Sequence, residues 1–455
     1  MQRLTLPGFF VVAGLAAGGC APAQSDDSGA GPQVVGEAVS SSDAVGEVPI
    51  YEWDSSWPVL PLPNNWAMGN VGGLEVDSQD HVWVLNRPRT LLRGHEDDAA
   101  YPIPESGCCT PPPSVIEFDP AGNVVQGWGG PGPEYEWVGS QNRQGAAGST
   151  NQGSPQAPPR GYDASYDAQS PQPARINLTP RTYHWPPSEH SLAIDHEGNV
   201  WLGGTHVLKF TRDGTFLMEI GYAPRGTVKR DSHNTTALGG GGSVAGVAVD
   251  ETTNEVFVAD GYSNRRVIVF DADTGAFKRY WGAYGKPPDD SVLPRRLPFE
   301  WKPSDPAPSQ FSVAHTIRID QDGRVYVGDR NNSRIQVFEK DGTFVRETFI
   351  KPTTMRGTIL DLNFSRDPEQ RWVFVADGRN DVIWILRRSD LQVIGEFGHG
   401  GQFGGQFTIA HAIAVDGSNN VYVGESLTGN RVQKFTYKGL GPPQRQYDRY
   451  GMAQN

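Results

Sequence analysis

The sequence predicts an all-β protein, a six-bladed β-propeller, and two observations support this. Six segments repeat one pattern, a strand, a tight turn, a second strand, a loop and a third strand, and they begin near Val71, His190, Val244, His315, Thr358 and His411. Four short strands in a unit of roughly 40 residues are typical of a propeller blade. After the N-terminal leader, no segment shows a long apolar period of 3.6 residues, so we expect little helix.

The elements of each unit follow from its local pattern. Every first strand alternates or runs apolar, and each following turn contains Asp, Asn or Gly, as in Asp322-Gly323, which fits a hairpin. Several third strands lead into "DGTF" or "DTGAF" and then a fourth strand, as in 338–349. The unit that begins near Thr358 is the most divergent. The last unit lacks an outermost strand, and we expect residues 51–62 ("YEWDSSWPVLPL") to supply it and close the ring.

One propeller over residues 49–440 therefore accounts for most of the 455 residues. Residues 1–20 have the features of an export signal, with a basic residue, an apolar run and Cys20 after Ala-Gly-Gly. We expect lipidation of Cys20 and attachment to a bacterial cell envelope, with ordinary secretion as the alternative, because the residue three places before Cys20 is Ala rather than a branched apolar one. Residues 21–48 form a predicted disordered tether and 441–455 a C-terminal tail.

Charge and cysteine content limit the partners. The net charge is −13 and no Lys/Arg cluster stands out, so nucleic acid is not an expected partner, and contact with a membrane is expected only through the lipid anchor. A closed propeller needs no partner to fold, which favours a monomer. The adjacent Cys108 and Cys109 form either a vicinal disulfide in an oxidising compartment or two structurally silent thiols.

Three histidines occupy one position of the repeat. His190, His315 and His411 each stand five residues before an aspartate, in the second, fourth and sixth units. Because the innermost strands line the central channel, alternate blades point these side chains at the axis about 120° apart. Three neutral imidazoles with an open position suit a catalytic zinc ion, and other divalent metals are also compatible. A single histidine there more often only packs, so the prediction depends on all three.

The ends of the second strands return to the same face of the propeller. Arg87 and Arg330 occupy matching places after "VWVLN" and "VYVGD", and Tyr262 lies one position further along in the third unit. Two arginines near a metal can bind a carboxylate, so we expect a small-molecule or peptide substrate that carries one. A tyrosine beside a divalent cation can lose its proton and act as a general base. Taken singly, such residues are usually surface ion pairs or packing residues.

"VYVGDRNNSRIQVF" and "VFVADGYSNRRVIVF" resemble NHL repeats. Over roughly residues 70–437, the chain resembles the peptidyl-α-hydroxyglycine α-amidating lyases, whose fold is a six-bladed propeller with a zinc ion on three histidines. The resemblance implies that the zinc ligands are His190, His315 and His411. It also implies that Tyr262, in "DGY-x-N-R", is the catalytic tyrosine and that Arg87 and Arg330 are the active-site arginines.

The chain departs from that family at three positions. Ile409 replaces a methionine, Ser263 removes a disulfide beside the tyrosine, and Ala412 replaces the acidic ligand of a structural calcium ion. The carbonyls near Val71 and Leu192 remain as calcium ligands, but we do not expect a complete calcium site. No copper monooxygenase domain is present in this chain, so the source of an α-hydroxyglycine is unexplained.

The resemblance implies a carbon–nitrogen lyase that cleaves an α-hydroxyglycine-type carbinolamide to an amide and glyoxylate. One alternative is a non-catalytic propeller that binds or scaffolds partners at the cell envelope, since fold does not imply function. A zinc hydrolase that acts on a lactone or ester is another alternative, but it would need acidic ligands or a general-base carboxylate near the axis. The repeat positions hold no such carboxylate.

Overall fold

The structure is a computed structural model that describes residues 46–92, 109–130, 183–224, 226–292 and 305–443. Cys20 and Cys108 lie outside these residues, as do the predicted signal and nearly all of the predicted tether and tail, so lipidation stays a prediction. Cys109 is disulfide-bonded. Among the described residues, no helix is long and apolar enough to cross a membrane.

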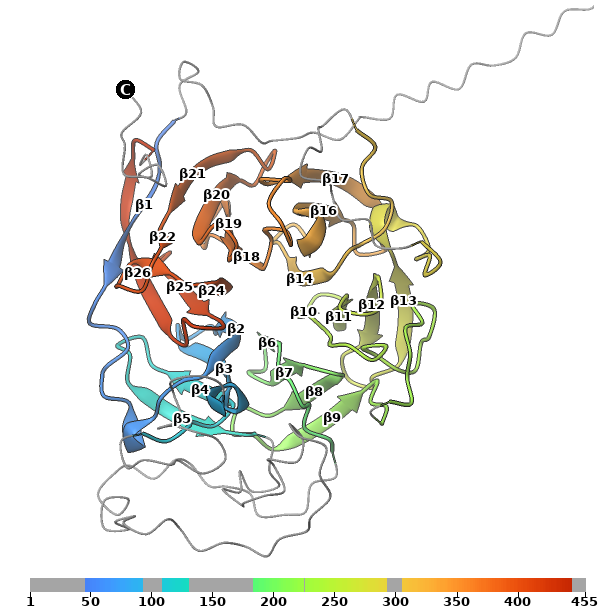
Figure 1. Ribbon diagram of the computed structural model, residues 1–455, viewed down its shortest axis with the longest axis horizontal. Coiled ribbons are helices and arrows are strands. Elements are labelled where there is room, and N and C mark those ends of the chain that lie inside the picture. The colour runs from blue at the N-terminus through green and yellow to red at the C-terminus, as the bar shows by residue number, and fades with distance from the viewer. Residues whose placement is uncertain (1–45, 93–108, 131–182, 225, 293–304, 444–455) are drawn as a thin grey trace, which may run out of the picture. The chain divides into compact units, whose positions relative to one another are not determined.

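Six four-stranded antiparallel sheets surround a central channel, which confirms the predicted all-β, six-bladed propeller (Figure 1). The innermost strands are β2, β6, β10, β14, β18 and β24. From the inside outward, the blades are β2 (Asn70–Val76), β3 (Val82–Arg87), β4 (Val115–Phe118) and β5 (Val124–Trp128); β6 (Ser191–Ile194), β7 (Val200–Gly203), β8 (Val207–Phe210) and β9 (Phe216–Ile220); β10 (Gly246–Asp250), β11 (Glu255–Asp260), β12 (Arg266–Asp271) and β13 (Phe277–Trp281); β14 (Ala314–Ile319), β15 (Val325–Asp329), β16 (Arg334–Phe338) and β17 (Phe344–Phe349); β18 (Asp361–Phe364), β19 (Trp372–Asp377), β20 (Val382–Arg387) and β21 (Val393–Phe397); β24 (Ala410–Val415), β25 (Val421–Glu425), β26 (Val432–Gly441) and β1 (Val48–Asp54).

The N-terminal strand closes the ring. β1 pairs antiparallel with β26, so the outermost strand of the sixth blade comes from the other end of the chain, as predicted. The strand covers Val48–Asp54 rather than the predicted 51–62. Two prolines after Asp54 remove backbone N–H donors, so that part of the segment cannot continue the ladder. β1 and β26 extend the propeller by one residue beyond each predicted boundary.

The hydrophobic core is divided among the six interfaces between neighbouring blades. In β11, Val256 and Val258 pack in the cluster shared with the second blade, and Phe257 and Ala259 pack in the cluster shared with the fourth. Because a central strand is buried on both faces, its sequence reads as a continuous apolar run.

In the third, fourth and sixth blades, an ion pair attaches the inter-blade loop to the blade that follows it. The Arg334 guanidinium lies 2.8 Å from Asp329 and donates to the carbonyls of Pro308 and Gln310 in the preceding loop. Arg266 with Asp260 and Arg431 with Glu425 repeat this arrangement in the third and sixth blades. These pairs fix the loops on the face that holds the histidines.

The aspartates at the far ends of the first strands have a structural role. Asp320 Oδ1 accepts the backbone N–H groups of Asp322 and Arg324, which stabilises the hairpin turn. Asp195 and Asp416 accept the equivalent bonds in their own turns. They lie at the ends of the strands opposite to the histidines and do not contribute to the candidate site.

Candidate metal centre

A β-bulge at the start of the innermost strand directs His315 and His411 toward the axis. In β14 the register jumps from Ala314 to Thr316, and His315 is the extra residue between them. His411 is the extra residue in β24, and His190 immediately precedes β6. A bulge leaves one residue outside the ladder and re-aims its side chain. The repeated bulge therefore gives the imidazoles of His315 and His411 the same orientation relative to their blades.

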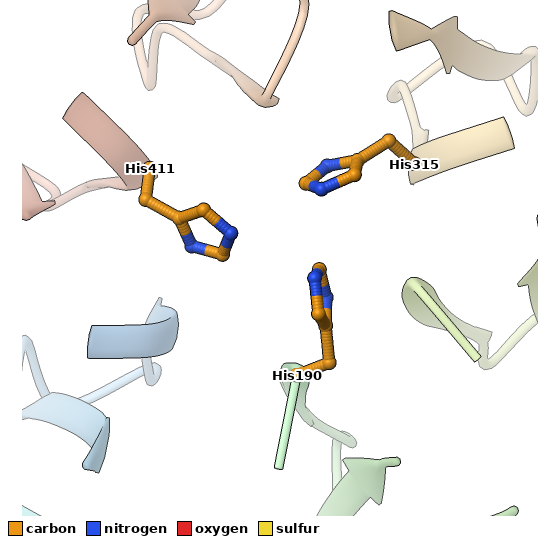
Figure 2. A group of neighbouring side chains, drawn as sticks. All are labelled: His190, His315 and His411. Carbon is orange, nitrogen blue, oxygen red and sulfur yellow. The ribbon is translucent and has the colours of Figure 1, made fainter. Parts of the chain in front are cut away.

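The three imidazoles converge on one point (Figure 2). Their ligating nitrogens lie within 4.8 Å of one another, and all three residues are buried. The ring centroid of His190 lies 4.8 Å from that of His315 and 5.1 Å from that of His411. The structure thus brings together the three residues that the repeat singled out.

Backbone carbonyls of the following blade set the tautomer of the rings. The Nδ1 of His190 lies 2.9 Å from the carbonyl oxygen of Ala245, and that of His315 lies 2.5 Å from the carbonyl oxygen of Leu360. Only a protonated Nδ1 can donate to a carbonyl, so Nε2 carries the lone pair in the neutral ring. The Val71 carbonyl likewise favours a proton on Nδ1 of His411, although these two groups make no hydrogen bond of regular geometry.

The local electrostatics keep these rings neutral. Burial lowers the pKa of all three histidines well below its usual value, and the positive charges of Arg87 or Arg330 lower it further. A neutral imidazole whose Nδ1–H is held by a backbone carbonyl presents Nε2 in the form that binds a divalent metal.

Tyr262 contacts the histidine cluster directly. It follows β11, and its hydroxyl oxygen lies 2.8 Å from His190 Nε2 and 3.0 Å from His315 Nε2. One phenolic proton can serve only one of these lone pairs. The other nitrogen is left facing the site without a proton, and a cation would satisfy it, so the donor set fits a metal ion. Tyr262 is 36 % exposed, so the site is open to solvent.

Gly261 allows Tyr262 to lie beside the histidines. A Cβ on Gly261 would lie 2.0 Å from the carbonyl oxygen of Ala314, the residue before His315. Glycine therefore lets the turn after β11 press against the start of β14, which places the phenol of Tyr262 over the histidine.

The two predicted arginines lie on either side of the cluster. Arg330, in the 3₁₀ turn Arg330–Asn332, donates from Nη1 to the Tyr262 hydroxyl at 3.2 Å, and its guanidinium lies over the Tyr262 ring. Arg87 ends β3 and donates from Nε to the carbonyl of Glu189, while its Nη2 is buried with no hydrogen-bond partner. An unpaired buried donor is costly, so Nη2 is suited to bind an anion.

Gly72 makes room for Arg87. It occupies the bulge of β2, the position that holds a histidine in alternate blades, and a Cβ there would lie 3.0 Å from Arg87 Nε. In the first blade the arginine therefore fills the space that a histidine side chain would otherwise occupy.

Sequence reasoning missed Glu189. Its side chain is buried and accepts from Ser114 and from the indole of Trp185, while its carbonyl accepts from Arg87. Glu189 therefore holds Arg87 beside His190. Its place directly before the histidine was the only signal for it, and the other two repeats have alanine there.

A second residue that sequence reasoning missed lies in the channel below the histidines. The Arg318 guanidinium lies 2.8 Å from Glu75 and 3.1 Å from Asp361, and it lines the same cavity as Leu192. Burial acts to lower the pKa of Arg318, but the two carboxylates outweigh this and raise it. A fixed cation in this cavity opposes binding of calcium to the neighbouring carbonyls. The incomplete calcium site stays a prediction.

Asp77, His81 and Glu117 form another group whose side chains could bind a metal. Arg212 already occupies this group, because its guanidinium lies 3.0 Å from Asp77 and contacts Glu117. A cation of the chain itself thus already pairs with these carboxylates, and we assign no metal to them.

Comparison with known proteins supports the fold and a family relationship over part of the chain. The NHL repeat family matches residues 311–338, which include His315 and confirm the predicted repeat type. The chain is 29% identical over 264 residues to peptidyl-glycine alpha-amidating monooxygenase B of Xenopus laevis, covering 54% of this chain and 26% of that protein. It is 28% identical over 265 residues to peptidylglycine alpha-amidating monooxygenase of Rattus norvegicus, covering 54% and 23%. The chain spans about a quarter of the length of these relatives.

Among solved structures, a streptogramin B lyase matches with a TM-score of 0.42 and 10% identity, over 87% of this chain and 100% of that one. This similarity is too weak to support an inference about the site. The similarity to the amidating proteins confirms the predicted resemblance as a sequence relationship, and the assignment of an activity depends on the residues of the site.

Proposed function

We propose that this chain is a zinc-dependent carbon–nitrogen lyase that cleaves α-hydroxyglycine-type carbinolamides to an amide and glyoxylate. The observation that carries the proposal is the Tyr262 hydroxyl, which lies within hydrogen-bond distance of two of the three converging histidines and of Arg330. The similarity to peptidylglycine alpha-amidating monooxygenases supports a role in amide-forming chemistry.

His190, His315 and His411 would hold the zinc ion through Nε2. When bound, the ion would supply Lewis acidity to the substrate hydroxyl. Arg87 and Arg330 would bind the glycine carboxylate. Arg87 has an unpaired buried Nη2, and Arg330 extends over the Tyr262 ring from the opposite side. The carboxylate and the hydroxyl of an α-hydroxyglycine share one carbon, so fixing the first also positions the second.

Tyr262 would act as the base. The positive charge of Arg330 stabilises a phenolate, which accepts the proton of the substrate hydroxyl. As the C=O bond of glyoxylate forms, the C–N bond breaks and its electron pair goes to the amide nitrogen. That nitrogen takes up the proton held by Tyr262, so the step is balanced and needs no oxidant or reductant.

The test is release of glyoxylate from α-hydroxyhippurate by the zinc-loaded chain. Because a positioned general base contributes about 10²–10⁴-fold, Tyr262→Phe is expected to lower kcat by that factor. Tyr437→Phe is the matched control, since Tyr437 packs against Tyr51 in the sixth blade, away from the histidines. Absence of glyoxylate, or equal rates for wild type and Tyr262→Phe, would refute the proposal.

A non-catalytic NHL-type propeller that binds partners is the second candidate, favoured by the repeat match in the fourth blade. Such a protein does not need three neutral imidazoles, a phenol and two arginines on one face. The same glyoxylate assay separates the two candidates.

A further inference from the structure

A third arginine occupies the tyrosine position of the repeat in the fifth blade. Asp377 ends β19 and is followed by Gly378-Arg379, as Asp260 ends β11 and is followed by Gly261-Tyr262. A Cβ on Gly378 would lie 2.6 Å from the carbonyl oxygen of Ala410, the residue before His411, just as Gly261 presses against the residue before His315. The fold therefore places Arg379 on the same rim of the site as Tyr262.

A fourth arginine lies beside it in the loop between β17 and β18. The Asn380 side chain donates to Thr354 at 3.2 Å, which joins the turn of Arg379 to this loop. Arg356 in the loop has a left-handed φ of 65°, and Gly357 after it packs directly against the carbonyl of Arg330. The loop is thus held against the base of Arg330, with Arg356 exposed to solvent beside the site.

These guanidiniums form a positive group next to the metal centre. Burial lowers the pKa of Arg379, and the like charges of Arg330 and Arg356 lower it further, while Asp377 and Asp381 oppose this. Among the described residues, no carboxylate lies within 4.0 Å of the guanidinium nitrogens of Arg330, Arg356 or Arg379, and Arg330 instead bonds the side chains of Asn331 and Tyr262.

The two nearby carboxylates are engaged elsewhere. Asp377 accepts from the backbone of Arg379, the Asn380 side chain and the Trp384 indole. Asp381 accepts the backbone N–H of Ile409. Clustered cations without a paired carboxylate favour an anionic ligand.

We propose that Arg379 and Arg356 form a second anion subsite, so that the preferred substrate carries a second anionic group on the amide side of its α-hydroxyglycine. This rests on the proposed function, in which Arg87 and Arg330 bind the glycine carboxylate. The substrate class is then a dianion, such as an acyl-α-hydroxyglycine with an acidic acyl group.

Hippurate and 4-carboxyhippurate are matched probes, since they differ by one carboxylate. Isothermal titration of the zinc-loaded full chain is expected to show about tenfold tighter binding of the dianion, as one charge-assisted contact gives. Arg379→Gln with Arg356→Gln is expected to abolish this preference. Arg371→Gln, in the turn before β19, removes an arginine remote from the site and is expected to keep the preference for the dianion. Equal affinity of wild type for both probes, or an unchanged preference in the double variant, overturns the inference.

A parallel glyoxylate assay separates this inference from the proposed function. Turnover of α-hydroxyhippurate and its 4-carboxy analogue with equal kcat/KM refutes the subsite and leaves the lyase assignment intact. No turnover of either compound refutes the lyase assignment, and the titrations with the two probes still decide whether the subsite exists.

Discussion

His315→Ala tests the metal centre most directly. The substitution removes one of three converging nitrogens and leaves the Leu360 carbonyl without its imidazole partner. Loss of a group that only hydrogen-bonds to a metal ligand lowers metal affinity by about 10–100-fold, so loss of the ligand itself is expected to cost at least about 100-fold. Zinc content measured by mass spectrometry is expected to fall from about one ion per chain to a small fraction.

Thermal unfolding gives an independent measure of the same loss. With free zinc about 100-fold above Kd, binding to the folded state alone stabilises it by about 2.7 kcal/mol. A propeller of about 400 residues has an unfolding entropy near ~0.8 kcal/mol/K, so zinc is expected to raise Tm by about 3 °C. His315→Ala should lose this increment.

The matched control is His399→Ala, since His399 is exposed and its ring nitrogen contacts the backbone carbonyl of the neighbouring Gly400. This variant should bind zinc as the wild type does. A folded wild-type chain that takes up no zinc, or a His315→Ala variant with unchanged zinc content and zinc-dependent Tm, would contradict the site.

Three further predictions concern stability and positioning. Arg334→Ala leaves Asp329 buried without its partner and should lower the free energy of unfolding by about 3–5 kcal/mol in urea titrations; a loss below 1 kcal/mol would contradict this. A hydrogen bond from Arg279 lowers the pKa of Glu255 from 4.5 in the unfolded chain to about 2 in the folded protein. The pair therefore stabilises the fold above pH 4.5, and this contribution is lost as the pH falls toward 2. Glu255→Gln should therefore cost about 1 kcal/mol at pH 7, because solvent screens part of the pair, and nothing near pH 2. Gly261→Ala should clash with the next blade, cost about 1–3 kcal/mol and displace Tyr262, which a drop in kcat without loss of bound zinc would reveal.

The propeller was predictable because its signals are local. Strand alternation, Asp-Gly turns and the six-fold repeat lie within short windows, and the position of each histidine is counted along one repeat. Even the missing strand of the last blade was evident, although prolines ended β1 at Asp54, earlier than the apolar pattern suggested. The repeat also indicated which residues share the face of the histidines, because every unit places the same position at the same end of its strand.

The site itself was decided by contacts between blades. The bulges that aim His315 and His411 leave no clear mark in the sequence, since they depend on the register between two strands. Glu189 supports Arg87 across two blades, and Arg318 crosses the channel to Glu75, 243 positions away in the chain. Such pairs form only when six blades close a ring of this diameter. The sequence by itself therefore determined the fold and the ligand types, and the tertiary structure decided which charges meet at the axis.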